Sequence, residues 1–305
     1  MIKLATLLAL VAGLMCVPVY AERLNVNLVV SEKGAPYQKF ANAFKEAIVS
    51  ADVDVDIIES HAVDGENLGL IVSVGMRSAK LAVLQPDTPV LFTMISAAGY
   101  RDLLDGLTTD GNRFDKITSA IYLDQPMSRQ MDFIKAVLPK RSKVGILYSS
   151  EEDFDLKAVR KVATNRGLSL VTRRVGEARL FPELEKVLST SDLLLAIPDG
   201  SIYNSSNIRN ILLTSYSRSI SLIGISRPYV RAGALSAIFS TPEQLANQAS
   251  EAVISFLRSK QLASPQYPAE YKIEVNREVA RALGIILPSK EAIRTLLSKS
   301  NEGRK

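Results

Sequence analysis

Small polar residues and glycines follow the predicted strands of this chain, and they are its best candidates for binding chemistry. Several of these loops open a predicted helix. A helix N-terminus offers free backbone N–H groups and a partial positive charge, which suit a carboxylate or another anion. The candidate ligand-binding residues are Ser31, Tyr37, Gly75, Arg77, Ser78, Ser96, Ser149, Asp199 and Tyr229.

Each of these positions also has a purely structural interpretation. Asp199-Gly200 is an ordinary turn dipeptide. Gly75 can be required only for the backbone conformation of the turn in which it lies. Ser78 can cap a helix or face water, and Arg77 can project into solvent. The sequence contains no glycine-rich phosphate fingerprint, no pair of catalytic carboxylates and no metal-spacing motif. The sequence therefore predicts neither a catalytic nor a metal site.

The composition excludes several classes of chemistry. Cys16 is the one cysteine and lies in the N-terminal apolar segment, so disulfides, cysteine nucleophiles and thiolate metal sites are not expected after it. His61 is the one histidine and follows a predicted strand, where a solvated loop residue is expected. A multi-histidine metal site is excluded, and a Ser-His-Asp triad is not expected, because His61 would have to be its only base. An exported hydrolase that uses two carboxylates stays open as a less favoured alternative.

The net charge of +5 does not indicate nucleic-acid binding. Basic residues are scattered among acidic ones, and no long basic run interleaves with aromatic residues. No cofactor is predicted.

Residues 1–21 have the pattern of a cleavable secretory signal peptide. A cationic start at Lys3 precedes an apolar run from Leu4 to Val17, and Ala21 ends the segment before polar residues. The apolar run is short for a permanent membrane span. An uncleaved anchor and a lipoprotein acylated at Cys16 are the alternatives, and the large Met15 argues against acylation. We therefore predict an exported protein.

Strand-like apolar runs alternate with helical patterns along the remaining chain. The candidate strands are 24–30, 53–58, 68–74, 90–95, 117–123, 144–148, 168–175, 193–197, 221–226 and 234–239. One helical stripe joins Phe40, Phe44 and Ile48, and another joins Leu245 to Phe256 after a capping box at Thr241.

The strands form two series with similar spacing, which predicts two α/β lobes. Continuous apolar strands that alternate with helices indicate parallel sheets covered on both faces. Ligands of such sheets bind beyond the carboxyl ends of the strands. Two lobes can share one cleft there and close on a ligand by a hinge motion.

Several segments resemble the periplasmic substrate-binding proteins of ABC transporters, in the group related to aromatic amino-acid binders. The resemblance covers nearly all of the chain after the leader, and the late segments are the most specific. The segments that carry it are 70–75, 125–139, 143–148, 195–199, 231–235 and 275–285.

The resemblance implies two Rossmann-like lobes with parallel sheets, joined by a three-strand hinge, with a ligand cleft between them. After the predicted signal peptide at 1–21, it places lobe 1 at 22–123 plus 238–272, and lobe 2 at 124–237 plus 273–305. Asp199 is expected to pair with a ligand amino group, and Ser78 to lie at the cleft. Arg77 is expected to help bind an anionic group, and Tyr37 or Tyr229 to cover an apolar part.

By the same resemblance, the protein is expected to be a non-enzymatic periplasmic monomer that binds a small, amino-acid-like solute and delivers it to a membrane ABC permease. Two departures from the family pattern put the ligand class in doubt: Met76 replaces a small hydroxyl residue, and residues 96–98 replace an Asp-Pro pair. They motivate one alternative, an exported sensor that signals to a membrane receptor kinase.

Overall fold

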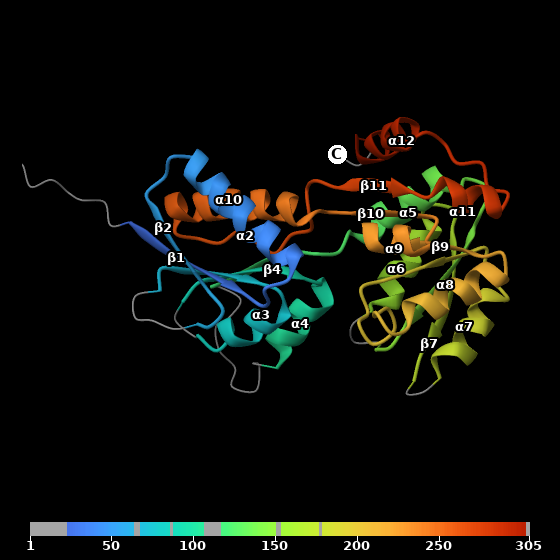
Figure 1. The fold of residues 1–305 in the computed structure, drawn as a ribbon, viewed down its shortest axis with the longest axis horizontal. Helices are drawn as coiled ribbons and strands as arrows, with labels where there is room; N and C mark the ends of the chain where they lie inside the picture. Colours follow the sequence, from blue (N-terminus) through green and yellow to red (C-terminus); the bar gives the residue numbers. More distant parts are fainter. Residues whose placement is uncertain are drawn as a thin grey trace, which may run out of the picture.

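The computed structural model describes residues 23–63, 68–85, 88–106, 117–150, 154–176 and 179–302. The predicted signal peptide lies outside the described residues. Two sheets, each with helices packed against it, lie side by side and are joined where the chain passes between them (Figure 1). This confirms the predicted fold of two α/β lobes.

The first sheet has five parallel strands in the order β2-β1-β3-β4-β5. Its central strands are almost entirely buried, as a parallel sheet with helices on both faces requires. The strands are β1 (Leu24–Val30), β2 (Val55–Ser60), β3 (Leu70–Val74), β4 (Val90–Ile95) and β5 (Thr118–Tyr122).

The second sheet has six strands in the order β11-β10-β9-β8-β6-β7, and β11 is antiparallel to β10. All ten predicted strands are present, with ends displaced by a few residues. Strand β11 was not predicted, because it is a short edge strand of four residues. The strands are β6 (Lys143–Tyr148), β7 (Ser169–Arg174), β8 (Leu193–Leu195), β9 (Ser221–Gly224), β10 (Ser236–Phe239) and β11 (Lys272–Val275).

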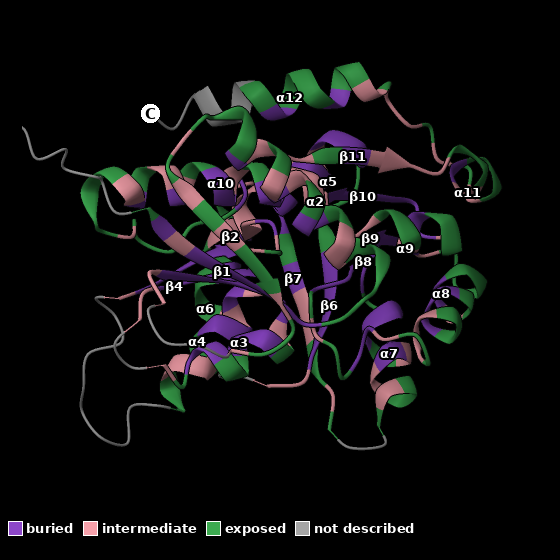
Figure 2. Ribbon diagram, turned by 60° about the vertical axis from the view of Figure 1, so that its left-hand side comes forward, coloured by how far each residue is buried: buried purple, intermediate pink, exposed green. Residues whose placement is uncertain are grey.

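The helices cover both sheets and turn their apolar stripes inward. Figure 2 shows buried residues concentrated in the strands and exposed residues on the outer faces of the helices. The helices are α2 (Ala35–Ser50), α3 (Met76–Ala82), α4 (Ala97–Asp105), α5 (Met127–Val137), α6 (Leu156–Thr164), α7 (Leu180–Leu188), α8 (Ile208–Ser217), α9 (Arg227–Ala232), α10 (Pro242–Ser259), α11 (Arg277–Ala282) and α12 (Lys290–Glu302).

Helix α10 packs beside α2 on the first sheet, although it follows the strands of the second sheet in sequence. The predicted capping box is present: the Gln244 N–H donates to Thr241 Oγ1, and Gln244 Oε1 accepts from the Thr241 N–H. Its predicted stripe, Leu245 to Phe256, is buried with Phe40 and Phe44 of α2. The chain therefore returns to the first lobe after β10.

The chain passes between the sheets after β5, after β10 and before β11. Ile238 and Phe239 pair with β11 and so lie in the second sheet. Gln266 forms a bridge with Ile121 beside the first sheet. The exact lobe boundaries at 123, 238 and 272 stay a prediction.

Candidate functional site

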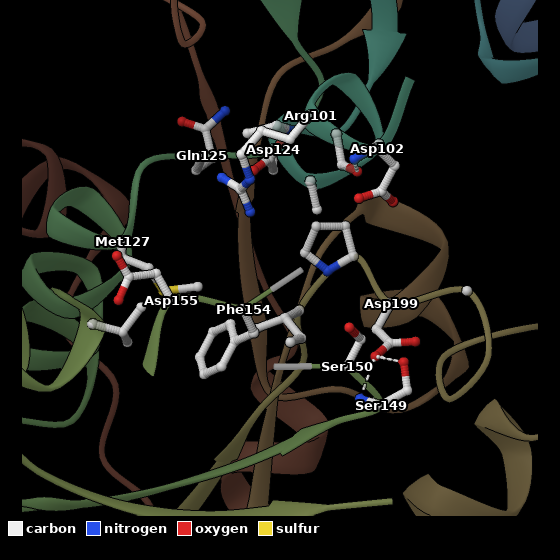
Figure 3. A pocket seen from close by; sticks show the side chains of 18 of the residues that line it. Arg101, Asp102, Asp124, Gln125, Met127, Ser149, Ser150, Phe154, Asp155 and Asp199 are labelled. Carbon is white, nitrogen blue, oxygen red and sulfur yellow. Dashed lines mark hydrogen bonds between the residues drawn. The ribbon is translucent and has the colours of Figure 1, made fainter. Parts of the chain in front are cut away.

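A cavity of about 530 Å³ lies between the two sheets and takes its walls from both. Most of its residues come from the loops after the carboxyl ends of strands and from helices α4 and α6, as the fold predicts. In Figure 3, Arg101, Asp102 and Asp124 lie on one side, and Phe154, Ser149 and Asp199 lie on the other. The lining residues are Ser96–Gly99, Arg101, Asp102, Asp124, Gln125, Met127, Ser149, Ser150, Phe154, Asp155, Ala158, Val159, Val162, Ile197–Ser201 and Tyr267.

The end of β4 is distorted where it reaches the cleft. Met94 has a positive φ of 54°, and the pairing of β4 with β5 shifts between Thr93 and Ile95. A non-glycine residue in the left-handed region costs roughly 1 kcal/mol or more, and such strain persists where the surroundings enforce it. The distortion delivers Ser96 to the N-cap of α4, where its hydroxyl accepts the Gly99 N–H at 3.0 Å.

Asp124 links the end of β5 to the same helix. Its Oδ1 accepts the Ala97 N–H at 2.8 Å, which places a carboxylate at the N-terminus of α4. Burial raises the pKa of Asp124, while this hydrogen bond and the nearby Arg101 guanidinium oppose the rise. Burial raises the pKa of Tyr122 and of Tyr267, and the charge of the Asp124 carboxylate adds to both rises. Asp124 is therefore a largely desolvated acid at the base of the cleft.

On the opposite wall, Asp199 holds two loops together. Its Oδ2 accepts the Ser149 N–H at 2.8 Å and the Ser149 hydroxyl at 2.7 Å. Its Oδ1 accepts the Ser201 N–H at 3.1 Å and the Ser201 hydroxyl at 2.6 Å. Both oxygens are therefore engaged within the protein, and the loops after β6 and β8 are fixed relative to each other (Figure 3).

Helix α6 gives this wall an apolar surface. Phe154, Val159 and Val162 line the cavity together, and Asp155 caps the helix by accepting the Ala158 N–H at 2.9 Å. The spacing of 159 and 162 places both side chains on one helical face. A ligand between the lobes would therefore meet an apolar surface that has a carboxylate at its end.

Aromatic rings connect the first core to the cleft. The ring centroids of Tyr122 and Tyr267 are 5.0 Å apart, and those of Tyr100 and Tyr122 are 5.9 Å apart. Phe92 continues the row at 5.7 Å from Tyr100. Burial raises the pKa of Tyr122 to about 12, so its phenol stays protonated at neutral pH. The row supports Tyr267, which is 40% exposed, at the edge of the cavity.

Polar groups tie the connecting segments together beside the cleft. Gln125 Nε2 donates to Ser240 Oγ at 2.8 Å, and the Ser240 hydroxyl donates to the Glu270 carbonyl. Arg129 Nη1 donates to Gln125 Oε1 at 2.6 Å and to the Pro268 carbonyl at 2.8 Å. All three connections between the sheets thus share one hydrogen-bond network.

The structure brings three of the nine predicted site residues together in the cleft: Ser96, Ser149 and Asp199. Their contact with a ligand stays a prediction. The remaining six do not contribute to the described lining of this cavity.

Ser31 and Ser78 belong to a buried network below the α3 N-terminus. Ser31 Oγ accepts the Ser78 N–H at 2.9 Å, and the Ser78 hydroxyl donates to the Gly75 carbonyl at 3.0 Å. Gly75 has a φ of +92°, and the Tyr37 ring packs against it. These contacts give Ser31, Tyr37, Gly75 and Ser78 structural roles in the first lobe.

Arg77 is exposed on α3. Tyr229 packs against Gly224, and its hydroxyl donates to the Tyr203 carbonyl at 2.8 Å. Tyr37 and Tyr229 therefore do not supply the aromatic surface of the cavity, a position that Tyr267 and Phe154 hold.

Sequence reasoning missed six lining residues that carry charge or an aromatic ring: Arg101, Asp102, Asp124, Phe154, Asp155 and Tyr267. Asp124 directly follows a predicted strand, so the rule applied to the other loops would have found it. Arg101 lies one turn into a helix, and Tyr267 lies in an irregular segment. Their positions depend on the tertiary fold.

His61 is exposed after β2, as predicted, and its Nδ1 lies 2.9 Å from the Val30 carbonyl oxygen. Within the described ranges, no group of three or more His, Cys, Asp or Glu residues could hold a metal ion. No helix among the described residues is long and apolar enough to cross a membrane.

Comparisons with solved structures show the same fold. A protein from Streptococcus pneumonia, described as an ABC domain in complex with L-Trp, matches with 18% identity and a TM-score of 0.61, over 89% of this chain and 97% of that one. The ligand-free, open structure of a substrate binding protein with adhesive properties from Clostridium difficile matches with 17% identity and a TM-score of 0.66, over 88% and 97%. A conserved domain protein from Vibrio cholerae matches with 18% identity and a TM-score of 0.62, over 90% and 97%.

No curated protein matches the sequence significantly. The family model described as ABC transporter substrate binding protein matches residues 37–296, which include both sheets and the cleft. This chain therefore belongs to the ABC transporter substrate binding protein family.

Proposed function

We propose that this protein is the exported solute-binding component of an ABC uptake system, which captures a small solute in its cleft and delivers it to a membrane permease. One observation carries the proposal: a cavity of about 530 Å³ lies between two sheets that are joined by hinge-like connections. This volume is within the usual range for small-molecule sites. A ligand that contacts both walls would stabilise a closed arrangement of the lobes.

The family supports this assignment, because its members typically bind solutes without chemical change and act outside the cytoplasm. The leader at residues 1–21 supports export, with cleavage after Ala21. We propose an amino-acid-like solute, since Arg101 lies on one wall of a partly apolar cavity and the Asp199 carboxylate lies on the other. Ser96, Ser149 and Asp199 would contact it together with Asp124 and Tyr267.

The proposal is tested with the exported protein and the permease complex encoded beside it. Solute-loaded protein should stimulate ATP hydrolysis by the reconstituted permease, and small-angle scattering should show that the loaded protein is more compact. A protein that binds its solute and closes, yet stimulates no neighbouring permease, would contradict the uptake role. Activation of a neighbouring receptor kinase in the same assay would favour the sensor alternative instead.

A further inference from the structure

The charged side chains of the cleft are mostly carboxylates, although the surrounding chain is basic. Asp102, Asp124, Asp155 and Asp199 line the cavity, with Arg101 as the one guanidinium among the described lining residues. Between residues 124 and 239, Lys and Arg outnumber Asp and Glu by 17 to 11. Every charged residue that this segment contributes to the described lining is nevertheless an aspartate. The acidic character is therefore local to the cleft.

The helix N-termini at the cleft are already bound by the protein's own side chains. At α4, Asp124 accepts the Ala97 N–H at 2.8 Å and Ser96 accepts the Gly99 N–H at 3.0 Å. At α6, Asp155 accepts the Ala158 N–H at 2.9 Å. An anionic ligand would have to compete with these internal acceptors. The features that predicted anion binding from sequence therefore do not favour it in the folded protein.

A charge count gives the sign of the cleft. Four carboxylates and one guanidinium leave a formal charge of −3. The N-termini of α4 and α6 each contribute about half a positive charge, so the net charge of the cleft is about −2. Closure of the lobes would remove water from these groups, and a net charge becomes costlier as water leaves. A cationic ligand would offset that cost, whereas an anion would increase it.

We propose that the solute captured in this cleft is an organic cation, an amine or a basic amino acid that carries a net positive charge. This inference rests on the proposed function. The apolar surface of Phe154, Val159 and Val162 fits the carbon skeleton of such a solute. Tyr267, at the edge of the cavity, can face an ammonium group through its ring. A metal ion fits less well, because no group of three metal-ligating side chains exists among the described residues.

The test offers two carbon skeletons to the exported protein, each in three charge states. Tryptamine, tryptophan and indole-propionate form one series; putrescine, γ-aminobutyrate and succinate form the other. Calorimetry and thermal unfolding measure binding at millimolar concentration and low salt. The cation of at least one series should bind most tightly, the zwitterion more weakly and the anion least. Tighter binding of a zwitterion or an anion overturns the inference, and so does a flat response to both series.

Substitutions of cleft aspartates, compared with a control substitution outside the cavity lining, test where the cation binds. Asp102→Asn and Asp155→Asn remove cleft charges, and asparagine still caps a helix at position 155. Each should weaken cation binding by about two- to fivefold, as expected for exposed ion pairs. Asp105→Asn, on α4 but outside the lining, should leave affinity unchanged. Equal effects of the 102 and 105 variants overturn the inference. An anion whose affinity depends on cleft residues overturns it too, but leaves the proposed uptake function standing.

Discussion

Replacement of Asp199 by alanine should destabilise the protein even when no ligand is bound. Its carboxylate accepts four hydrogen bonds, two from Ser149 and two from Ser201. Hydrogen bonds to charged groups contribute about 1.5–3 kcal/mol each. The carboxylate is half-buried, so water and solvent screening recover much of the loss, and we expect a decrease of about 2–4 kcal/mol in the free energy of unfolding.

Urea unfolding of the ligand-free protein measures the global effect, and amide hydrogen exchange measures the local one. The Ser149 and Ser201 amides should exchange faster in Asp199→Ala, because both lose their acceptor. Asp192→Ala is a matched control: its carboxylate accepts the Ser142 and Lys143 N–H groups, each at 2.9 Å, near the start of β6. It should lower stability but leave ligand affinity unchanged.

Unchanged unfolding and unchanged exchange in Asp199→Ala would refute the structural role of this carboxylate. A loss of ligand affinity without any loss of stability would instead favour direct recognition of a ligand amino group, as the sequence predicts. The two roles are therefore separable, because one is measured without ligand and the other requires it.

Three further predictions concern the stability of the folded protein. Burial raises the pKa of Asp124, so the native state binds the proton of this carboxyl group more tightly than the unfolded chain does. The contribution of Asp124 to the free energy of unfolding should therefore fall as pH rises from its ordinary pKa of 3.8 through the raised pKa. Asp124→Asn should flatten that part of the pH–stability profile, and an unchanged profile would contradict the assignment. Arg129→Ala should lower the free energy of unfolding by about 1–3 kcal/mol, because it removes two hydrogen bonds and a contact 4.9 Å from the Tyr271 ring; urea unfolding tests this. Gly75→Ala should cost about 1–3 kcal/mol in thermal unfolding, because φ is +92° and the added Cβ would lie 2.7 Å from Ser31 Oγ; a neutral result would show that the turn relaxes.

The sequence predicted the fold well because its signals are local. The buried strands are continuous apolar runs, and α10 begins at a capping box with its apolar stripe already in phase. Strand β11 was not predicted, because four residues of mixed polarity on a sheet edge show little hydrophobic periodicity. Its position depends on antiparallel pairing with β10, which local sequence does not encode.

The candidate site was predicted less well, because its chemistry depends on which partners the fold supplies. Ser78 opens a helix, as expected, but Ser31 from a different strand binds its N–H group and buries it. Tyr229 has the right residue type, yet its hydroxyl bonds to the Tyr203 carbonyl. Asp199 was selected as the partner of a ligand amino group, and the structure gives both of its oxygens partners within the protein. In each case a residue distant in sequence forms a hydrogen bond with the group that the sequence analysis had assigned to ligand binding.

The position of Asp124 connects ligand charge to lobe closure. Asp124 precedes Gln125, whose side chain donates to Ser240 and accepts from Arg129 within the network that joins the three connections. A rotation of the lobes about these connections would therefore keep Asp124 near the axis while the walls at 102 and 199 approach each other. A cation bound beside Asp124 would meet the converging carboxylates without itself having to move. Closure would then bring the carboxylates around a stationary bound cation. The attraction between these opposite charges strengthens as water is expelled from the cleft.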